Sequence, residues 1–359
     1  MKICIIGDGL VSLVLAESLS KKGIDIDLVV KRAKKDKKTL RTLGISRENL
    51  NFLQNLFPSI ISIGNKINQI EIFNDTKNKI LNFGNLHTTL FYMFKYDEIF
   101  KSVERKVIKN RGIKIIFQSK TFQLLDKTLS KYNLIIDTNI NNNFSRQHFY
   151  KKIKKDYFST AYISIIKHDN IKNNIARQVF TNIGPLAFLP LSKNLTSIVY
   201  SINNYKYKKI DDSNLISKIK NYNFGYNNIY FSKFENFKLN LNLLKKYYFK
   251  NVLAFGDKLH TIHPLAGQGF NMSLRDIKIL NNIINDNLNL GLPLDTSILN
   301  KFQNSSKYKN IIFATGIDFI HEFFSIEKKI PKTITNKLFN FLDKEKISKY
   351  LSDIANKGI

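Results

Sequence analysis

The chain has 359 residues and is strongly basic, with 57 Lys and Arg against 28 Asp and Glu and a formal net charge of +29. This length is enough for one large domain or two interleaved domains with a substantial core. Only eight of the basic residues are Arg, and no zinc, homeodomain or RNA-binding signature is present. We therefore interpret the charge as a solvated basic surface rather than a nucleic-acid site, with attraction to an anionic membrane face or acidic partners as the alternative.

The chain has a single cysteine, Cys4, which excludes a disulfide or cysteine metal framework. A strand pattern begins at residue 2, so we expect no signal peptide, and no apolar run reaches the roughly 18 residues that span a bilayer. The expected compartment is a reducing cytoplasm.

The first elements predict a strand, a glycine-rich turn, a helix and a second strand. Apolar residues 3–6 lead into Gly7-Asp8-Gly9, a helical pattern runs from Leu10 and Val11 to about residue 19, and residues 24–30 form the next strand. This is the context of a dinucleotide fingerprint, in which Gly7 permits the tight turn and Gly9 lets the backbone approach a pyrophosphate.

Two positions depart from that fingerprint. Ser12 replaces the third glycine, whose role is close packing of helix and strand. The acidic residue that would hold the ribose is missing, because Val30 and Lys31 stand at its place. A lost charge-assisted hydrogen bond costs about 1.5–3 kcal/mol, so either another group holds the ribose or nucleotide affinity is lower.

The middle of the chain predicts alternating helices and strands. They are a helix at 47–56, a hairpin at 67–72 and 80–83, a helix at 95–110, and strands at 113–117 and 132–137. Arg41, flanked by small and apolar residues, is a candidate for a phosphate or flavin contact, and a surface arginine is the alternative. Residues 158–168 and 178–201 alternate apolar and polar types. The prolines Pro185 and Pro190 predict a shaped edge or a pocket-lining loop at 184–191 rather than a regular central strand.

A second glycine-rich loop follows the apolar run 252–255. It contains Gly256-Asp257, then His263-Pro264, and Gly267-Gln268-Gly269-Phe270, and a helix pattern begins at Asn271. Such a loop offers free N–H groups and the positive end of a helix dipole to an electron-rich ligand. His260 and His263 lack a third ligand for zinc, so we expect them to bond nearby backbone. Further helices are predicted at about 297–324 and 332–355.

Together these segments resemble the FAD-dependent aromatic hydroxylases of ubiquinone biosynthesis, a family of single-component flavin monooxygenases with a p-hydroxybenzoate hydroxylase-like fold. The resemblance rests on the Gly7-x-Gly9 turn, on segments 41–46 and 184–191, and most of all on Gly256-Asp257 with residues 260–271 and 274–276. It implies an α/β fold: a Rossmann-like FAD-binding domain interleaved with an antiparallel-sheet substrate domain, and a helical C-terminus. The implied boundaries are 1–66, 92–148 and 250–320 for FAD binding, 67–91 and 149–249 for substrate, and 321–359 for the C-terminal helices.

The resemblance also implies roles for site residues. Asp257 would bind the ribityl chain and Arg41 would touch the flavin. The loop beside the flavin ring would comprise His263, Pro264, Gly267, Gln268 and Gly269, and no residue is assigned as acid or base. The full cofactor-binding set is Gly7, Gly9, Leu10, Val11, Arg41, Gly256, Asp257, Pro264, Gly267, Gly269, Phe270 and Asn271.

The implied activity is hydroxylation of the aromatic ring of a polyprenylated phenol or quinol through a flavin C4a-hydroperoxide, with NAD(P)H and O₂ as co-substrates. It implies partners among other ubiquinone-biosynthesis proteins and peripheral association with the inner face of a membrane.

Several departures leave alternatives open. Asn139-Ile140 replace an Asp-Gly pair of a second fingerprint, Lys258-Leu259 replace two small residues, and Ser273 replaces a glycine. Adenosine binding and hydride delivery are the steps that these changes affect. The alternatives are a catalytically impaired relative that acts as a binding or scaffold subunit, and a flavin-dependent reductase or dehydrogenase that acts on lipids.

Overall fold

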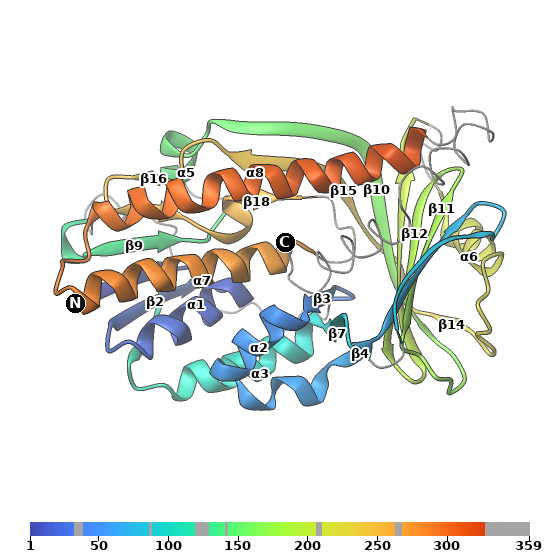
Figure 1. Cartoon of the computed structure of the whole chain (residues 1–359), viewed down its shortest axis with the longest axis horizontal. Helices are drawn as coiled ribbons and strands as arrows, with labels where there is room; N and C mark the ends of the chain where they lie inside the picture. Colours follow the sequence, from blue (N-terminus) through green and yellow to red (C-terminus); the bar gives the residue numbers. More distant parts are fainter. Residues whose placement is uncertain are drawn as a thin grey trace.

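The structure is a computed structural model that describes residues 1–31, 39–85, 88–118, 129–140, 143–205, 210–262 and 268–326, with the backbone alone at 31, 118, 129, 268 and 317–326. A parallel sheet with its helices lies at one end of the molecule and a large antiparallel sheet at the other (Figure 1). The long helix α8 (Thr296–Ile326) runs along both parts. The predicted α/β class, with parallel and antiparallel sheets and a helical C-terminal part, is confirmed.

The six-stranded sheet has the order β16-β17-β9-β1-β2-β8 and is parallel apart from β16. Strand β1 pairs with β2 on one side and with β9 on the other, so the strand order changes direction at β1. The bounds are β1 (Lys2–Ile6), β2 (Asp25–Lys31), β8 (Ile113–Gln118), β9 (Leu134–Asp137), β16 (Tyr248–Phe249) and β17 (Val252–Ala254).

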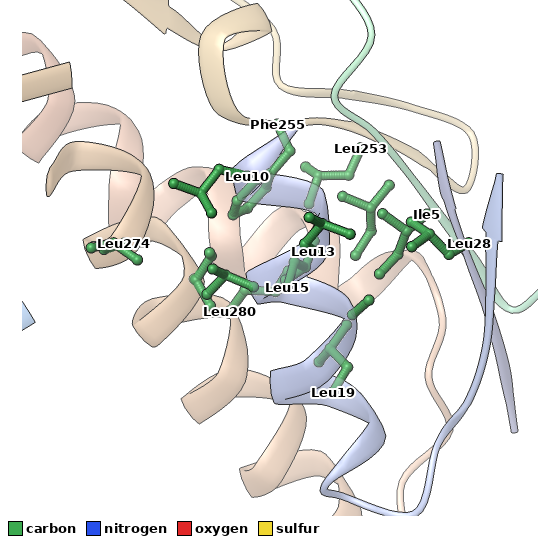
Figure 2. Close-up of a cluster of buried hydrophobic side chains, with 14 of the residues drawn as sticks. Ile5, Leu10, Leu13, Leu15, Leu19, Leu28, Leu253, Phe255, Leu274 and Leu280 are labelled. Atoms are coloured by element: carbon green, nitrogen blue, oxygen red, sulfur yellow. The ribbon is translucent and has the colours of Figure 1, made fainter. Parts of the chain in front are cut away.

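Helix α1 (Leu10–Ser20) is apolar almost all round because it is buried on more than one side. Figure 2 shows Leu13 of α1 beside Ile5 and Leu28 of the sheet, while Leu274 and Leu280 of α7 (Gln268–Asn289) belong to the same cluster. Within the described residues, the other helices and 3₁₀ turns are α2 (Arg47–Leu56), η1 (Pro58–Ile63), α3 (Tyr96–Lys109), η2 (Leu129–Lys131), α5 (Asn143–His148), α6 (Asp212–Lys220) and η3 (Gly256–Lys258).

The nine-stranded sheet follows the path β18-β15-β10-β13-β12-β11-β5-β6, with β14 paired to β10. Its pairs are antiparallel except β11 with β5. The bounds are β5 (Gln69–Asn74), β6 (Lys79–Gly84), β10 (Lys152–Lys167), β11 (Ile175–Thr181), β12 (Gly184–Ser192), β13 (Leu195–Asn203), β14 (Tyr230–Phe231), β15 (Glu235–Leu244) and β18 (His260–Thr261). A three-stranded sheet, β3 (Thr42–Ser46), β7 (Phe91–Lys95) and β4 (Asn65–Ile67), lies in the order β3-β7-β4.

The prediction that the proline-containing stretch is an edge or a loop was wrong. Residues 184–192 form strand β12, which lies between β11 and β13 inside the sheet. The prolines are tolerated because each stands where only one neighbour is paired. Pro185 pairs with Phe180 of β11 before the pairing with β13 begins. Pro190 pairs with Thr196 of β13 beyond the end of the β11 ladder, next to a register shift.

Most predicted elements are found close to their expected bounds, and α7 begins at Gln268 rather than at Asn271. The helix expected at 332–355 lies outside the described residues. The domain boundaries stay a prediction. Strand β18, which that prediction assigns to the FAD-binding part, pairs with β15 of the nine-stranded sheet. Among the helices of the described ranges, none is both long enough and apolar enough to cross a membrane.

Candidate active site

A cavity of about 890 Å³ opens at the carboxyl ends of the central parallel strands. Gly7 follows β1, Thr138 follows β9 and Asp257 follows β17, and all three line it. Open parallel sheets bind ligands at this edge, where successive connections leave a strand in opposite directions. The opposite wall comes from the nine-stranded sheet, so the cavity lies between the two sheets.

The turn after β1 is shaped for an anionic group. Gly7 has φ +138, and a Cβ there would lie 2.0 Å from Thr138 Oγ1, so only glycine fits. Gly9 is the N-cap of α1 and provides no side-chain cap, and a Cβ at Gly9 would meet no atom within 4 Å. Leu10 and Val11, the first residues of α1, line the cavity beside this open space, and a helix N-terminus suits an anionic ligand.

Ser12 takes over the packing role of the third glycine through a hydrogen bond. Its Oγ lies 2.7 Å from Thr138 Oγ1. The Thr138 hydroxyl donates to the Ile6 carbonyl at 3.0 Å, so Ser12 is the donor to Thr138. A small polar residue thus joins α1 to the end of β9 without widening the gap between them.

Arg41 and Tyr96 form one side of the cavity. The Arg41 guanidinium lies 5.4 Å from the centre of the Tyr96 ring. Burial raises the pKa of Tyr96, and Asp8 and Asp257 raise it further while Arg41 opposes them. Neither Tyr96 nor Asp8 is among the site residues predicted from the sequence. The position of Tyr96 directly after the apolar strand 91–95 was the available signal.

Asp257 is exposed and lines the cavity from η3, as expected of a residue that contacts a ligand. Its carbonyl accepts a hydrogen bond from the Thr261 hydroxyl at 3.1 Å, which closes the turn. Gly256 precedes it with φ +64 and is buried, and a Cβ there would lie 3.2 Å from Val11 Cγ1. Gly256 therefore lets the turn approach α1 closely and is not part of the cavity lining.

The start of α7 borders the same cavity through Gly269 and Phe270. Asn271 is buried instead. Its amide donates to the Gly44 carbonyl at 2.8 Å, and its oxygen accepts the Ser46 N–H at 3.1 Å. Asn271 thus fastens α7 to β3, whose Gly44 lines the cavity. His263, Pro264, Gly267 and the side chain of Gln268 lie outside the described residues.

His260 differs from the expectation of a backbone-bonded loop histidine. Its Nε2 lies 2.8 Å from Asp276 Oδ2, and both side chains are buried. Asn310 also donates to that oxygen, at 3.3 Å. The pair joins strand β18 to α7 and α8, behind the cavity wall to which His260 contributes.

The wall opposite the parallel sheet carries both apolar and polar side chains, and most of the polar ones stand on β15. Leu189 is the one residue of the 184–191 stretch that lines the cavity, because side chains alternate along β12. Leu186 and Phe188 point to the other face and pack with α6. The other apolar lining residues on strands are Leu43, Met93, Ile163, Val199, Phe237 and Leu239.

The fold first defines the class of protein. The structure of p-nitrophenol 4-monooxygenase PnpA of Pseudomonas putida superimposes with a TM-score of 0.74 over 99% of this chain and 97% of that one, at 11% identity. PqsL of Pseudomonas aeruginosa, described as a probable FAD-dependent monooxygenase, gives 0.67 over 88% and 94%, at 14% identity. The chain therefore has the fold of FAD-dependent aromatic monooxygenases.

Proteins that are similar in sequence belong to a narrower group of monooxygenases. Ubiquinone biosynthesis monooxygenase COQ6 of Dictyostelium discoideum is 27% identical over 184 residues, 41% of this chain and 37% of that protein. The 3-demethoxyubiquinol 3-hydroxylase of Escherichia coli is 27% identical over 176 residues, 47% of this chain and 44% of that enzyme. The matches thus span less than half of each relative, and no protein-family model matches the chain. The resemblance inferred from the sequence motifs is confirmed.

Proposed function

We propose that this protein is an FAD-dependent monooxygenase that hydroxylates the aromatic ring of a polyprenylated phenol or quinol in ubiquinone biosynthesis, with NAD(P)H and O₂ as co-substrates. The observation that carries the proposal is the cavity that joins the N-terminus of α1, which has no side-chain cap, to a wall of the nine-stranded sheet with apolar side chains at Ile163, Leu189 and Val199. The names of the sequence relatives support the reaction and the substrate class, and favour an enzyme over a scaffold subunit.

The residues at the parallel-sheet end fit FAD. Gly9 leaves open space beside the first N–H groups of α1, which suits a pyrophosphate. Asp257 and Arg41 line the cavity further on and would hold the ribityl chain and the flavin. Gly269 also faces open space, since a Cβ there would meet no atom within 4 Å, so the start of α7 can approach a planar ring.

FAD, when bound, would take a hydride from NAD(P)H and react with O₂ to supply the oxygen that enters the substrate ring. The chain's own part is positioning and electrostatics. The N-terminus of α7 would stabilise negative charge on a reduced flavin. The apolar side chains of Met93, Leu189 and Leu239 would hold the substrate ring and keep water away from the reacting atoms.

The setting of the reaction is also proposed. A polyprenylated substrate resides in a lipid bilayer, and a chain with a net charge of +29 is attracted to an anionic membrane face. We therefore place the protein in the cytoplasm at the inner membrane face, near other proteins of ubiquinone biosynthesis.

The decisive experiment is the visible spectrum of the purified protein, recorded before and after addition of NADPH under argon and again after oxygen. Bound flavin that bleaches and then recovers supports the enzyme. Flavin that stays oxidised would place a defect at hydride delivery and direct attention to Asn139 and Ile140, which line the cavity. A colourless protein that cannot be reconstituted with FAD would overturn the proposal in favour of a scaffold.

A second measurement separates the hydroxylase from a lipid reductase. The hydroxylase consumes O₂ and forms a hydroxylated ring when a prenylated phenol is added. Turnover of a lipid substrate without dependence on oxygen would identify the reductase instead.

A further inference from the structure

Two buried side chains of opposite charge meet behind the cavity wall. Asp137 ends strand β9, Lys258 ends η3, and the Lys258 ammonium donates to Asp137 Oδ2. The side chains are 0% and 1% exposed. The ammonium also lies 5.4 Å from the centre of the Phe149 ring. Burying two charges is costly even when they pair, so this depth is weak evidence for a purely stabilising role.

The partners of this pair connect two separate walls of the cavity. The second oxygen of Asp137, Oδ1, accepts the N–H of Asn139 at 3.0 Å. The carboxylate therefore shapes the Thr138–Asn139 backbone with one oxygen and holds Lys258 with the other. Lys258 in turn directly follows Asp257. Thr138, Asn139 and Asp257 all line the cavity, whereas Asp137 and Lys258 do not.

Each charge of the ion pair depends on the other because both are buried. Burial lowers the pKa of Lys258, and the carboxylate of Asp137 opposes that shift. Loss of either partner would leave the other charge buried without its counter-ion. Lys258 also stands at one of the positions where the chain departs from the pattern of the hydroxylases it resembles.

We propose that Asp137 and Lys258 are a positioning pair, which holds Asp257 and the Thr138–Asn139 backbone at the spacing that the FAD site requires. Cofactor affinity then depends on two residues that do not touch the cofactor. This inference rests on the proposed function, because it takes FAD as the occupant of the cavity.

The test uses the double variant D137N/K258M. The amide oxygen introduced at position 137 can still accept the N–H of Asn139, and the thioether side chain introduced at position 258 fills the space beside Phe149, so neither charge is left unpaired. The FAD dissociation constant is measured at 10 °C by quenching of flavin fluorescence. Urea unfolding of the apoprotein at the same temperature gives the folded fraction, by which the apparent constant is corrected. We expect an apoprotein urea midpoint close to that of the unmodified chain and FAD binding at least tenfold weaker.

A matched control comes from the other end of the same sheet. Lys2 and Asp27 form an ion pair at 2.8 Å that lies away from the cavity lining. The variant D27N/K2M has the same substitutions and should bind FAD as tightly as the unmodified chain.

The outcomes separate the two proposals. Tight FAD binding by the unmodified chain and equally tight binding by folded D137N/K258M would overturn the positioning role alone. Equal weakening in D27N/K2M would also overturn it, since the effect would then be general. Failure of the unmodified chain to bind FAD would overturn the proposed function together with this inference.

Discussion

Replacement of Gly7 by alanine tests the close approach of β1 and β9 at the cavity. The new Cβ would lie 2.0 Å from Thr138 Oγ1 at a residue with φ +138. The backbone strain costs about 1–3 kcal/mol. Displacement of Thr138 would also weaken its hydrogen bonds to Ser12 and Ile6, each worth about 1 kcal/mol. We expect G7A to lower the free energy of unfolding by about 3–5 kcal/mol.

A double-mutant cycle isolates the contact from the strain. T138A removes the Oγ1 atom and the two hydrogen bonds, and should cost about 1–3 kcal/mol. In G7A/T138A the contact with Oγ1 is absent, and the Ser12 hydroxyl, 2.9 Å from the new Cβ, can rotate away because T138A has removed its partner. The strain at residue 7 is then the main cost added to that of T138A. The double variant should therefore be more stable than the sum of the singles predicts, by about 1–2 kcal/mol.

The assay is urea unfolding of the apoproteins, followed by circular dichroism, with FAD affinity measured in parallel. Costs that add to within about 0.5 kcal/mol would show that the two positions are independent. In that case the contact between Gly7 and Thr138 is not the reason for a glycine at this position.

Three further predictions follow from the site and its core. D257A should weaken FAD binding by about 1.5–3 kcal/mol, the contribution of a hydrogen bond to a charged group. The urea midpoint should stay unchanged because the side chain is exposed. Equal FAD affinities of D257A and the unmodified chain in calorimetric titrations would contradict this prediction. L189A should raise the KM for a prenylated phenol, whereas L186A, on the opposite face of β12, should lower the free energy of unfolding by about 2–5 kcal/mol and leave KM unchanged. Burial raises the pKa of Cys4 from 9.0 to about 12, so between these values the native thiol keeps its proton while the unfolded one loses it. The contribution of Cys4 to stability is therefore complete below pH 9.0 and is lost as the pH rises towards 12. The stability of C4A should fall less steeply over that range, and equal slopes in urea titrations of the two proteins would refute the assignment.

The sequence by itself determined the order and type of most elements, because their signals are local. The helix at 47–56 is predicted by apolar spacing, and the structure has α2 at Arg47–Leu56. The signal of the dinucleotide turn is equally local, since Gly7-Asp8-Gly9 lies directly between an apolar strand and the helix that follows it. The close approach of Thr138 to Gly7, by contrast, joins distant segments. The motif around Gly256 and Asp257 predicted the class of fold for the same reason.

Tertiary structure alone decided the features that join distant segments. Pro185 and Pro190 are compatible with an interior strand only because the ladders of β11 and β13 end at different residues of β12. The pairing of Asp137 with Lys258 spans 121 positions and depends on β9 and β17 being neighbours in the sheet. Local periodicity reports which face of an element is apolar. It does not report which element that face meets, because the partner is selected by the packing of the whole chain.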